Sequence, residues 1–385
     1  MEGYPDAKKV AFVHDFLVSY GGAERVLESL LLLYPEAPVY TLLYDKEAMG
    51  ERFSGRDIRV SFLGKFPKIL RRRYRWLLPF FPVAIETFDL RDFDLVISSS
   101  GAWGKGIVTR LHTIHIAYLH SPMRFLWDAN ERYLDMVRVG FGKRFFVRLF
   151  LSFLRVWDKE AADRPDVLVA NSQHTRSRIQ KYYRRESSVI YPPVHIPDIP
   201  PNGSLLQGKE SVDFFLIVAR LSESKGLSVA IEAFNKLGLP LWIVGEGKDH
   251  ARLERMAGEN ISFLGHVSDA ELHALYTKAQ ALIMPSEEDF GMVAAESLAA
   301  STPVIALGRG GALEIVEPGV TGEFFFAETS EVLADAIRRF LDRGRGRYTS
   351  GHEIVKSRFS KTAFLSEWRS LIDETMKKHG QKQSS

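Results

Sequence analysis

The sequence predicts an α/β protein of two doubly wound domains with parallel sheets. Three observations lead to this prediction: buried-strand runs alternate with helical patterns, one proline-rich stretch interrupts the alternation, and the alternation then restarts. Continuous apolar strands separated by amphipathic helices indicate parallel sheets that are covered on both faces. A length of 385 residues also favours two domains over one.

The first half contains four apolar runs that we expect to be strands, at residues 10–17, 95–98, 114–119 and 167–170. A helical pattern follows the first run and extends through Leu33, and Asn171-Ser172 opens a second helix that ends near Tyr183. The stretch 191–203 then contains five prolines, which fix φ and remove backbone donors. A domain boundary is therefore expected there.

The second half repeats the alternation. Strands are expected at residues 214–219, 241–244, 261–264, 281–284 and 304–306, and helices at 225–237, 330–341 and 361–377. The predicted organisation is a first Rossmann-like domain at 1–195, a linker at 196–210, a second such domain at 211–360, and a helix with a tail at 361–385 that packs back on the first domain. Each sheet offers a ligand crevice at the carboxyl ends of its strands. Two facing domains would form a cleft that closes on a two-part substrate and shields it from water.

Composition narrows the class of protein. The chain has no cysteine, which excludes disulfides, thiolate zinc sites and a cysteine nucleophile. A net charge of +3 is too small to imply a nucleic-acid partner. Residues 1–9 are polar with no apolar core after them, and no apolar stretch is long enough to span a bilayer, so we expect a cytoplasmic protein.

Two glycine turns follow predicted strands. Gly21-Gly22-Ala23-Glu24 precedes a helix whose free N–H groups suit a phosphate or a sugar oxygen, but a plain turn with a good helix start is an equal alternative. Gly245-Glu246-Gly247 lacks the full G-x-G-x-x-G spacing, so a nicotinamide dinucleotide is not supported, and a tight turn explains it equally well.

A basic pair follows the first strand of the second domain. Arg220 is expected at the carboxyl edge of the sheet and Lys225 at the N-terminus of the next helix. With the backbone N–H groups there, the two side chains can neutralise a diphosphate. Fixed cations stabilise the charge that builds on a leaving diphosphate more than they stabilise the ground state. The alternative is two solvated surface cations.

Two glutamates follow the strand expected at 281–284. Glu288 is expected in a loop and Glu296 on a helix that begins around Gly291, so both can face one cleft if the loop folds back. One carboxylate can accept two ribose hydroxyls, and the other can hold hydroxyls of a sugar. The alternative is an acidic surface loop at a helix start, which Glu287 and Asp289 make credible.

Taken in order, these segments resemble glycosyltransferase family 4, which has the GT-B fold. The resemblance covers nearly the whole chain and rests on segments that begin at Gly21, Asn171, Tyr191, Val218, Glu288, Ser301 and Gly310. Glu288 to Glu296 reproduces the family's E-x7-E spacing, including Phe290-Gly291. One departure is Asp289, which stands where the family usually has glycine and puts the role of Glu288 in more doubt than that of Glu296.

The resemblance implies a hexosyltransferase and assigns roles to its residues. Arg220 and Lys225 are expected to hold the donor diphosphate, Glu296 the nucleotide ribose, and Glu288 the transferred sugar. His120 looks like the family's cleft histidine that contacts the donor sugar; the alternative is a capped histidine at a strand end, with His112 and His115 close by. The expected catalytic residues are Glu288, His120, Arg220 and Lys225, and the expected donor-binding residues are Gly21, Gly22, Arg220, Lys225, Glu288, Phe290, Gly291, Met292, Val293 and Glu296.

The resemblance also implies a reaction. Transfer is expected to retain the anomeric configuration by a same-face displacement in which the leaving phosphate helps take the acceptor proton. No cofactor and no metal are expected, and no D-x-D pair is placed to bind one. The segment 118–128 resembles mannosyltransferases of polysaccharide and O-antigen assembly, so GDP-mannose is the favoured donor and UDP-glucose the competitor.

Two segments of the first domain interleave basic and aromatic residues, at 65–85 and 142–157. This pattern suits an anionic membrane surface, which makes a polyprenyl-linked glycan a natural acceptor and predicts peripheral association with the inner face of the cell membrane. The alternative is a pair of core-packing helices with solvated arginines.

Three rival functions remain in view. Another enzyme of the same fold, such as an epimerase or a phosphorylase, is opposed by the order of the motifs. A non-catalytic lipid- or polysaccharide-binding protein is opposed by intact Arg220, Lys225, Glu288 and Glu296. Nucleic-acid binding lacks a recognised module.

Overall fold

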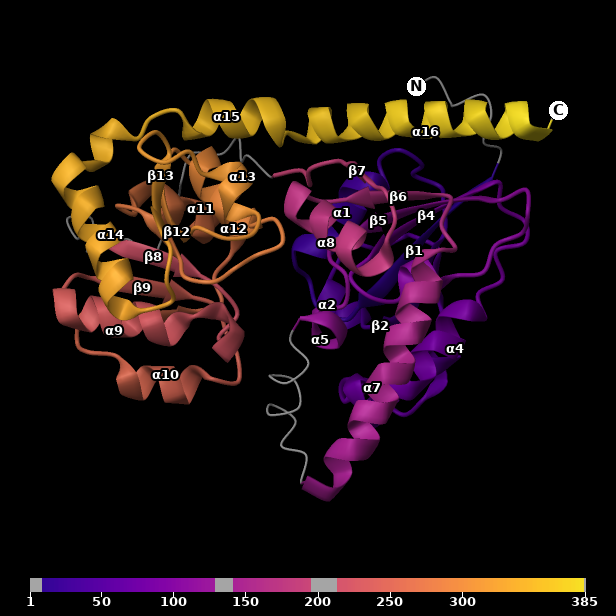
Figure 1. The fold of residues 1–385 in the computed structure, drawn as a ribbon, viewed down its shortest axis with the longest axis horizontal. Helices are drawn as coiled ribbons and strands as arrows, with labels where there is room; N and C mark the ends of the chain where they lie inside the picture. The colour runs from indigo at the N-terminus through magenta and orange to yellow at the C-terminus, as the bar shows by residue number, and fades with distance from the viewer. Residues whose placement is uncertain (1–8, 129–140, 195–212, 384–385) are drawn as a thin grey trace. The chain divides into compact units, whose positions relative to one another are not determined.

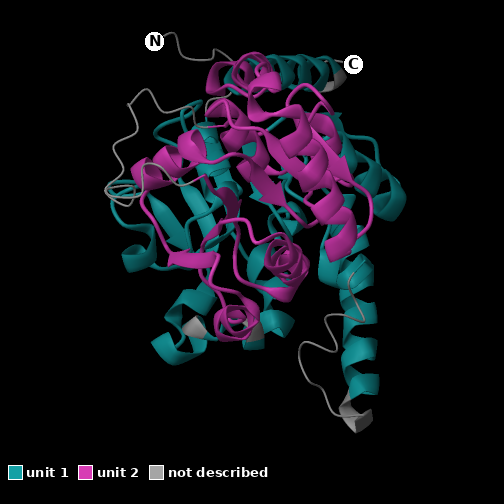
Figure 2. Cartoon of the chain, turned by 90° about the vertical axis from the view of Figure 1, so that its left-hand side faces the viewer, with its two compact units in different colours: residues 1–191, 364–385 teal, residues 192–363 magenta. Residues whose placement is uncertain are grey.

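The structure, a computed structural model of the whole chain, describes all residues except 1–8, 129–140, 195–212 and 384–385. The chain divides into two compact units. Unit 1 comprises residues 1–191 and 364–385, and unit 2 comprises residues 192–363 (Figure 2). The linker expected at 196–210 falls outside the described residues.

Unit 1 contains a seven-stranded parallel sheet with the order β3-β2-β1-β4-β5-β6-β7 (Figure 1). Its strands are β1 (Val10–Leu17), β2 (Val39–Tyr44), β3 (Ile58–Val60), β4 (Leu95–Ser100), β5 (Ile114–Leu119), β6 (Val167–Ala170) and β7 (Ser188–Val189). The chain builds outward from β1 to one edge through β2 and β3, and to the other edge from β4 onward. The order therefore reverses between β1 and β4, which pair with each other.

Helices cover both faces of this sheet. They are α1 (Gly22–Leu30), α2 (Lys46–Met49), α3 (Lys68–Arg72), α4 (Phe81–Glu86), α5 (Arg124–Trp127), α7 (Phe141–Ala162), α8 (Gln173–Tyr183) and α16 (Lys361–Gln383). On one face, Phe12 of β1 shares a buried cluster with Leu27 of α1 and Trp368 of α16. On the other face, Val13 shares a cluster with α4 and α7. The alternation of β1 side chains thus separates two cores, as expected of a strand at period 2.

Unit 2 contains a six-stranded parallel sheet with the order β10-β9-β8-β11-β12-β13. Its strands are β8 (Phe215–Val218), β9 (Leu241–Val244), β10 (Ile261–Gly265), β11 (Leu282–Met284), β12 (Val304–Leu307) and β13 (Gly322–Phe325). Its helices are α9 (Leu227–Leu237), α10 (His250–Met256), α11 (Asp269–Lys278), α12 (Met292–Ala299), α13 (Ala312–Ile315), α14 (Ser330–Arg343) and α15 (Gly351–Arg358). Here the order reverses between β8 and β11.

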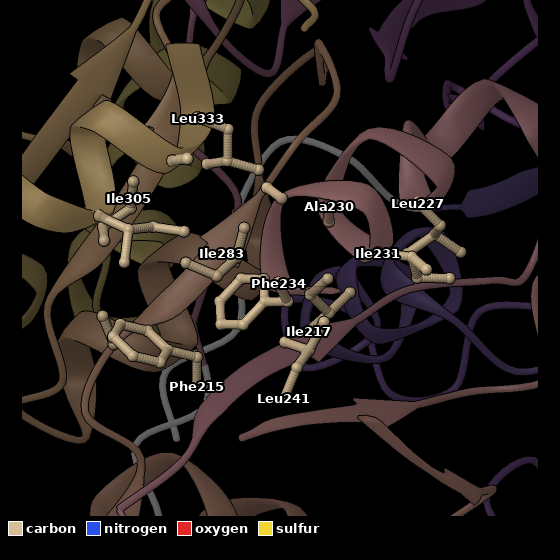
Figure 3. Packing of buried hydrophobic residues seen from close by; sticks show 14 of the residues in the cluster. Phe215, Ile217, Leu227, Ala230, Ile231, Phe234, Leu241, Ile283, Ile305 and Leu333 are labelled. Carbon is tan, nitrogen blue, oxygen red and sulfur yellow. The ribbon is translucent and has the colours of Figure 1, made fainter. Parts of the chain in front are cut away.

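The core of unit 2 forms where helices pack on one face of the sheet. Phe215 and Ile217 of β8 point into the same buried cluster as Phe234 of α9 and Leu333 of α14 (Figure 3). Both helices place apolar residues at the three- and four-residue spacing that this packing requires. The packing fixes the ends of β8 and β11, where the predicted basic and acidic residues lie.

The two doubly wound sheets confirm the predicted fold class, with corrections to single elements. Strands β2, β3, β7 and β13 were not predicted. The helix expected from residue 225 begins at Leu227, because Gly226 adopts a left-handed φ of 65° and separates it from a short turn at Glu223–Lys225. The helix after β1 ends at Leu30 and does not extend through Leu33. No helix of the described chain is long and apolar enough to cross a membrane.

Candidate functional site

In unit 2, a lysine and a glutamate meet where the strand order reverses. Lys225 follows β8 and Glu288 follows β11, and these two strands are neighbours in the sheet. Lys225 Nζ lies 2.5 Å from Glu288 Oε1, which also accepts a hydrogen bond of 3.0 Å from Ser286 Oγ. Parallel α/β sheets bind ligands at the carboxyl ends of the strands that flank such a reversal. The pair therefore lies at the position in unit 2 best suited to a ligand.

Gly226 allows the two loops to approach each other. Its φ of 65° lies in the left-handed region, and a Cβ built there would lie 2.5 Å from the carbonyl oxygen of Pro285. A side chain at this position would therefore be strained and would also push the loop after β8 away from the loop after β11. Glycine here sets the distance across which Lys225 reaches Glu288.

The loop that carries Glu288 is also held from its other side. The Gly311 N–H donates a hydrogen bond of 2.8 Å to the carbonyl of Glu288, and a Cβ on Gly311 would lie 2.1 Å from the carbonyl oxygen of Phe290. Phe290 is buried and packs edge-on against Phe359 at 5.3 Å. The loop is thus fixed by backbone contacts, although the Glu288 side chain that it carries is 23% exposed.

The other predicted residues of unit 2 lie around this loop. Gly291 caps α12 with a φ of 103°, and Met292 and Val293 form its partly buried first turn. Glu296, further along α12, accepts a hydrogen bond of 3.1 Å from the Tyr276 hydroxyl. The structure therefore brings Glu288 into contact with Lys225, and Glu296 into contact with a tyrosine that sequence reasoning did not identify.

Arg220 is positioned differently from Lys225. Its side chain is exposed, and within the described part of the chain the guanidinium has no protein partner. The geometry of Arg220 thus fits both sequence interpretations, a group that awaits an anion and a solvated cation. In the nearby turn 245–247, the Gly245 N–H bonds the Gly265 carbonyl and the Glu246 carbonyl accepts from Leu221 N–H, so this turn ties β8, β9 and β10 together.

In unit 1, the strand order reverses between β1 and β4, and Asp15 links these two strands. Sequence analysis did not identify this residue. Asp15 lies near the end of β1 and is 7% exposed. Its carboxylate accepts backbone N–H bonds from four successive residues after β4, Gly101, Ala102, Trp103 and Gly104, at 2.6 to 3.0 Å. The Ser100 hydroxyl donates a fifth bond at 3.0 Å. Hydrogen bonds to a carboxylate are among the strong ones, so Asp15 fixes the loop after β4 at the edge of the sheet.

His120 lies beside this loop at the end of β5. Its Nε2 is 2.9 Å from Ser99 Oγ, and its ring packs edge-on against Tyr118 at 5.3 Å. Burial of the ring away from water lowers the pKa of His120 to about 3, and the nearby His14 makes a smaller contribution in the same direction. At neutral pH His120 is therefore a neutral imidazole, which can donate one hydrogen bond and accept another.

The neighbours of His120 separate the functional histidine candidate from the structural one. His115, the second residue of β5, is fully buried, bonds Ser98 Oγ at 2.8 Å, and has a pKa lowered to about 3 by burial and by Arg185 and Arg164. His112 is exposed on the preceding turn. Of the three histidines considered from sequence, only His120 combines partial burial with a position at the carboxyl edge of the sheet.

The double-glycine turn belongs to the same edge. Gly21 is the N-cap of α1 and supplies no side chain there, and its φ of −160° is open to any residue. Glu24, in the first turn of α1, lies 3.5 Å from His14 Nε2. His14 and Asp15 interrupt the apolar run of β1 near its end, and this pair of polar residues in a buried strand was the signal that sequence reasoning could have used.

No group of three His, Asp or Glu side chains suited to a metal ion occurs among the described residues. The two arrangements that do occur are a cation–carboxylate pair with an exposed arginine in unit 2, and a neutral histidine at the same sheet edge as a glycine-capped helix start in unit 1. The first suits a diphosphate, and the second suits the hydroxyls of a sugar.

Two family models match the chain almost end to end. A model described as Glycosyltransferase Family 4 matches residues 20–196, and one described as Glycosyl transferases group 1 matches residues 206–352. With two parallel-sheet domains of Rossmann type, the protein is a glycosyltransferase of the GT-B class. It belongs to the group 1, family 4 glycosyltransferases and is a hexosyltransferase.

Individual relatives agree with this assignment. The chain is 27% identical to human alpha-1,3/1,6-mannosyltransferase ALG2 over 93% of this chain and 94% of the relative. It is 24% identical to an uncharacterized glycosyltransferase of Methanocaldococcus jannaschii over 86% and 88%. Among solved structures, Anabaena HepE in complex with UDP and glucose matches with a TM-score of 0.72 and 18% identity, over 95% of this chain and all (100%) of that one.

Proposed function

We propose that this glycosyltransferase moves a hexose, with retention of anomeric configuration, from a nucleotide-sugar to a glycan or a lipid-linked glycan. The observation that carries the proposal is the Lys225–Glu288 pair at the reversal between β8 and β11, with the exposed Arg220 in the same loop after β8 as Lys225. A cation held by a carboxylate at such an edge is placed to meet a diphosphate and the sugar attached to it.

The chemistry of the donor half follows from charge. When the bond between the sugar and the diphosphate breaks, negative charge grows on the leaving phosphate oxygens. Lys225 and Arg220 would stabilise this charge without a metal or another cofactor, and the stabilisation is greater in the transition state than in the bound donor. Glu288 would orient Lys225 and accept hydroxyls of the sugar, Glu296 would accept the ribose hydroxyls, and residues 290–293 would line the donor at the start of α12.

The residues of unit 1 would serve the transferred sugar. His120, held neutral, can hydrogen-bond a sugar hydroxyl at neutral pH without carrying a charge of its own. Gly21 and Gly22 add no side chains of their own at the start of α1, where Glu24 Oε2 would lie 3.3 Å from a Cβ at Gly21, so a sugar oxygen could approach the N–H groups there. In a same-face displacement, the leaving phosphate would take the proton of the acceptor hydroxyl, which requires no protein base.

We favour GDP-mannose as the donor. The similarity to a mannosyltransferase over nearly the full chain supports mannose. UDP-glucose is the competing donor, because the fold is shared with a protein solved with UDP and glucose.

A thermal-shift series with GDP, UDP, GDP-mannose and UDP-glucose tests both donors. A ligand at one hundred times its dissociation constant stabilises the folded state by about 2.7 kcal/mol, which is a measurable shift. Selective stabilisation by the guanine compounds supports GDP-mannose, and selective stabilisation by the uracil compounds replaces it with UDP-glucose. If neither series shifts the melting temperature, the assignment of a nucleotide site to these residues is wrong.

We further propose that the enzyme works in the cytoplasm at the inner face of the cell membrane, on an acceptor carried by a polyprenyl lipid. The support is chemical: basic and aromatic residues alternate in segments 65–85 and 142–157 of unit 1. Such segments are attracted to anionic lipid. Transfer assays with lipid-linked and free glycan acceptors test this, and equal rates on both would remove the lipid from the proposal.

A further inference from the structure

Tyr276 links helix α11 to the carboxylate of Glu296 on α12. It is 3% exposed, and its hydroxyl donates a hydrogen bond of 3.1 Å to Glu296 Oε2. Glu296 itself is partly exposed and lies just over one turn from Met292, where α12 begins after the loop that follows β11. A buried hydroxyl thus holds a partly exposed carboxylate near the edge of the sheet at which parallel α/β domains bind ligands.

The backbone that carries Tyr276 is fixed by Thr302. The buried Thr302 hydroxyl donates a hydrogen bond to the carbonyl of Tyr276, and the Thr302 carbonyl accepts one of 3.0 Å from Ser297 Oγ on α12. Because Ser297 is the chain neighbour of Glu296, one residue ties the end of α11 to the turn of α12 that carries the carboxylate. Tyr276 and Glu296 are therefore held near each other by contacts that do not involve the tyrosine hydroxyl.

Another tyrosine–glutamate hydrogen bond in unit 2 serves the core. The Tyr348 hydroxyl donates a bond of 2.7 Å to Glu323 Oε1, and the same carboxylate pairs with Arg343. Tyr348 and Glu323 are both 5% exposed, and Glu323 is the second residue of β13, near the amino end of that parallel strand. Glu296 differs in both respects, since it is partly exposed and lies near the carboxyl edge. The difference favours a role for the Tyr276–Glu296 bond toward a ligand.

The bond from Tyr276 affects how Glu296 can bind hydroxyl groups. A carboxylate has about four acceptor positions on its two oxygens, so one bond from a tyrosine leaves capacity for further donors. Glutamate is a flexible side chain, and holding it in place before a ligand arrives removes part of the entropic cost of binding. The two neighbouring hydroxyls of a ribose can donate to a carboxylate that is held in this way.

We propose that Tyr276 is a positioning residue that holds the Glu296 carboxylate ready for the donor ribose and so strengthens the preference of the site for ribonucleotides over deoxyribonucleotides. The inference rests on the proposed function, in which Glu296 accepts the ribose hydroxyls. Tyr276 acts through Glu296, because its own side chain is buried. A site built to bind a hydroxyl discriminates against an analogue that lacks it, since its polar groups then lose their partners.

Calorimetric titration of the full chain tests the inference with GDP and its dideoxy analogue, which lacks both ribose hydroxyls, and in parallel with UDP and its dideoxy analogue. For the base that binds, the wild type should prefer the ribonucleotide by about tenfold or more. Tyr276→Phe keeps the ring and should lower this preference roughly three- to tenfold, the effect of one hydrogen bond and one ordered side chain. Its affinity for the dideoxy analogue should equal that of the wild type.

Turnover gives a second measurement. The KM for the donor should rise in Tyr276→Phe by the factor seen in the binding of the ribonucleotide, with kcat within about twofold of the wild type, because the lost interaction is made equally in the ground state and the transition state.

Tyr348→Phe is the matched control. It removes the hydroxyl of the Tyr348–Glu323 bond and should cost stability, but it should keep the wild-type preference for the ribonucleotide. A general loss of folding weakens the binding of both nucleotides by the same factor, so the ratio of the two affinities reports the ribose contact. Glu296→Ala should abolish the preference, and Tyr276→Phe added to it should change nothing further.

The outcomes separate this inference from the proposed function. If Glu296→Ala loses the preference for the ribonucleotide and Tyr276→Phe keeps it, the positioning role of Tyr276 is wrong and the proposed donor site stands. An equal loss of preference in Tyr276→Phe and Tyr348→Phe also overturns the role, since the effect would not be specific to Glu296. If neither nucleotide binds the wild type, or if Glu296→Ala keeps the preference, the proposed ribose contact of Glu296 fails and the inference fails with it.

Discussion

The ammonium of Lys225 and the carboxylate of Glu288 are 2.5 Å apart and join the loops that follow the two strands between which the order of the second sheet reverses. In the first sheet, Asp15 of β1 holds the loop that follows the neighbouring strand β4 through backbone N–H groups. Both units thus use a carboxylate to hold the edge of the sheet at its reversal, but only in unit 2 is the partner a cation that a ligand can share.

Lys225→Ala should lower kcat by about 10²–10³-fold, the loss typical of removing one group that stabilises transition-state charge. The folded state should lose less than about 1 kcal/mol, since the pair is partly exposed and solvent screens it. Initial rates of hexose transfer measure the first effect and urea unfolding the second. Lys236→Ala removes an exposed ion pair with Glu331 in the same unit and should leave transfer unchanged. Wild-type turnover in the Lys225 variant would refute the proposed role.

Asp15→Asn should destabilise unit 1 by about 2–3 kcal/mol, because an amide group can replace only part of the acceptor capacity of the carboxylate and leaves buried N–H groups unpaired. Urea unfolding measures the change. Asp45→Asn is the matched control: Asp45 accepts two backbone N–H bonds at the exposed N-cap of α2, where asparagine caps equally well. Equal stability of the two variants would show that the Asp15 contacts do not hold the loop.

Gly226→Ala should cost more stability than Gly238→Ala, although both positions have nearly the same φ, 65° and 67°. The left-handed conformation alone costs roughly 1–2 kcal/mol for alanine. A Cβ at 226 would also meet the Pro285 carbonyl at 2.5 Å, whereas nothing lies within 4 Å of one at 238. Steric overlap of this kind adds about 1–3 kcal/mol. The urea midpoints of the two variants measure the stability lost. An equal loss would mean that the loops after β8 and β11 can move apart at no cost in free energy.

Stability should fall as the pH is lowered from about 6.5 towards 3, because burial lowers the pKa of His115 to about 3 in the folded chain. Between these values the unfolded chain binds the additional proton, so the contribution is complete above the unfolded pKa and is lost on acidification. Each such histidine contributes at most about 1.4 kcal/mol per pH unit.

A variant that combines His115→Phe with Ser98→Ala tests this contribution, since it removes both partners of a buried hydrogen bond. The unfolding free energy, measured in urea at several pH values between 7.5 and 5, should then change less steeply with pH than in the wild type. Ser98→Ala alone keeps the histidine, so its unfolding free energy should depend on pH as steeply as that of the wild type. If the unfolding free energy depends on pH equally in all three proteins, the lowered pKa of His115 is wrong.

Much of the fold was predictable because the buried strands are continuous apolar runs. The predicted bounds of β1 and β5 agree with those observed, Val10–Leu17 and Ile114–Leu119. Strand β13 was not predicted: it starts at Gly322 and includes Glu323, so its sequence alone does not read as a buried run. A local sequence pattern shows only the spacing of apolar residues, whereas the extended conformation of this strand depends on its pairing with β12.

The candidate site was predictable as residue types but not as contacts. The sequence indicates Lys225 and Glu288 separately, because each follows an apolar run. Their pairing depends on β8 and β11 being neighbours, which is a property of strand order that no local pattern contains. Asp15 was missed for a related reason. Its carboxylate accepts hydrogen bonds from residues that lie more than 80 positions away in the sequence.

Helix α16 makes the order of synthesis differ from the order of assembly. Phe364, Trp368 and Ile372 are buried in the same core as β1, so the earliest strands made by the ribosome wait for the last helix. Unit 2, which is continuous from 192 to 363, has all of its own residues before then. Nascent chains of unit 1 therefore carry an open apolar surface throughout translation, and a stop codon just before residue 364 would leave that surface permanently uncovered while unit 2 keeps all of its own residues.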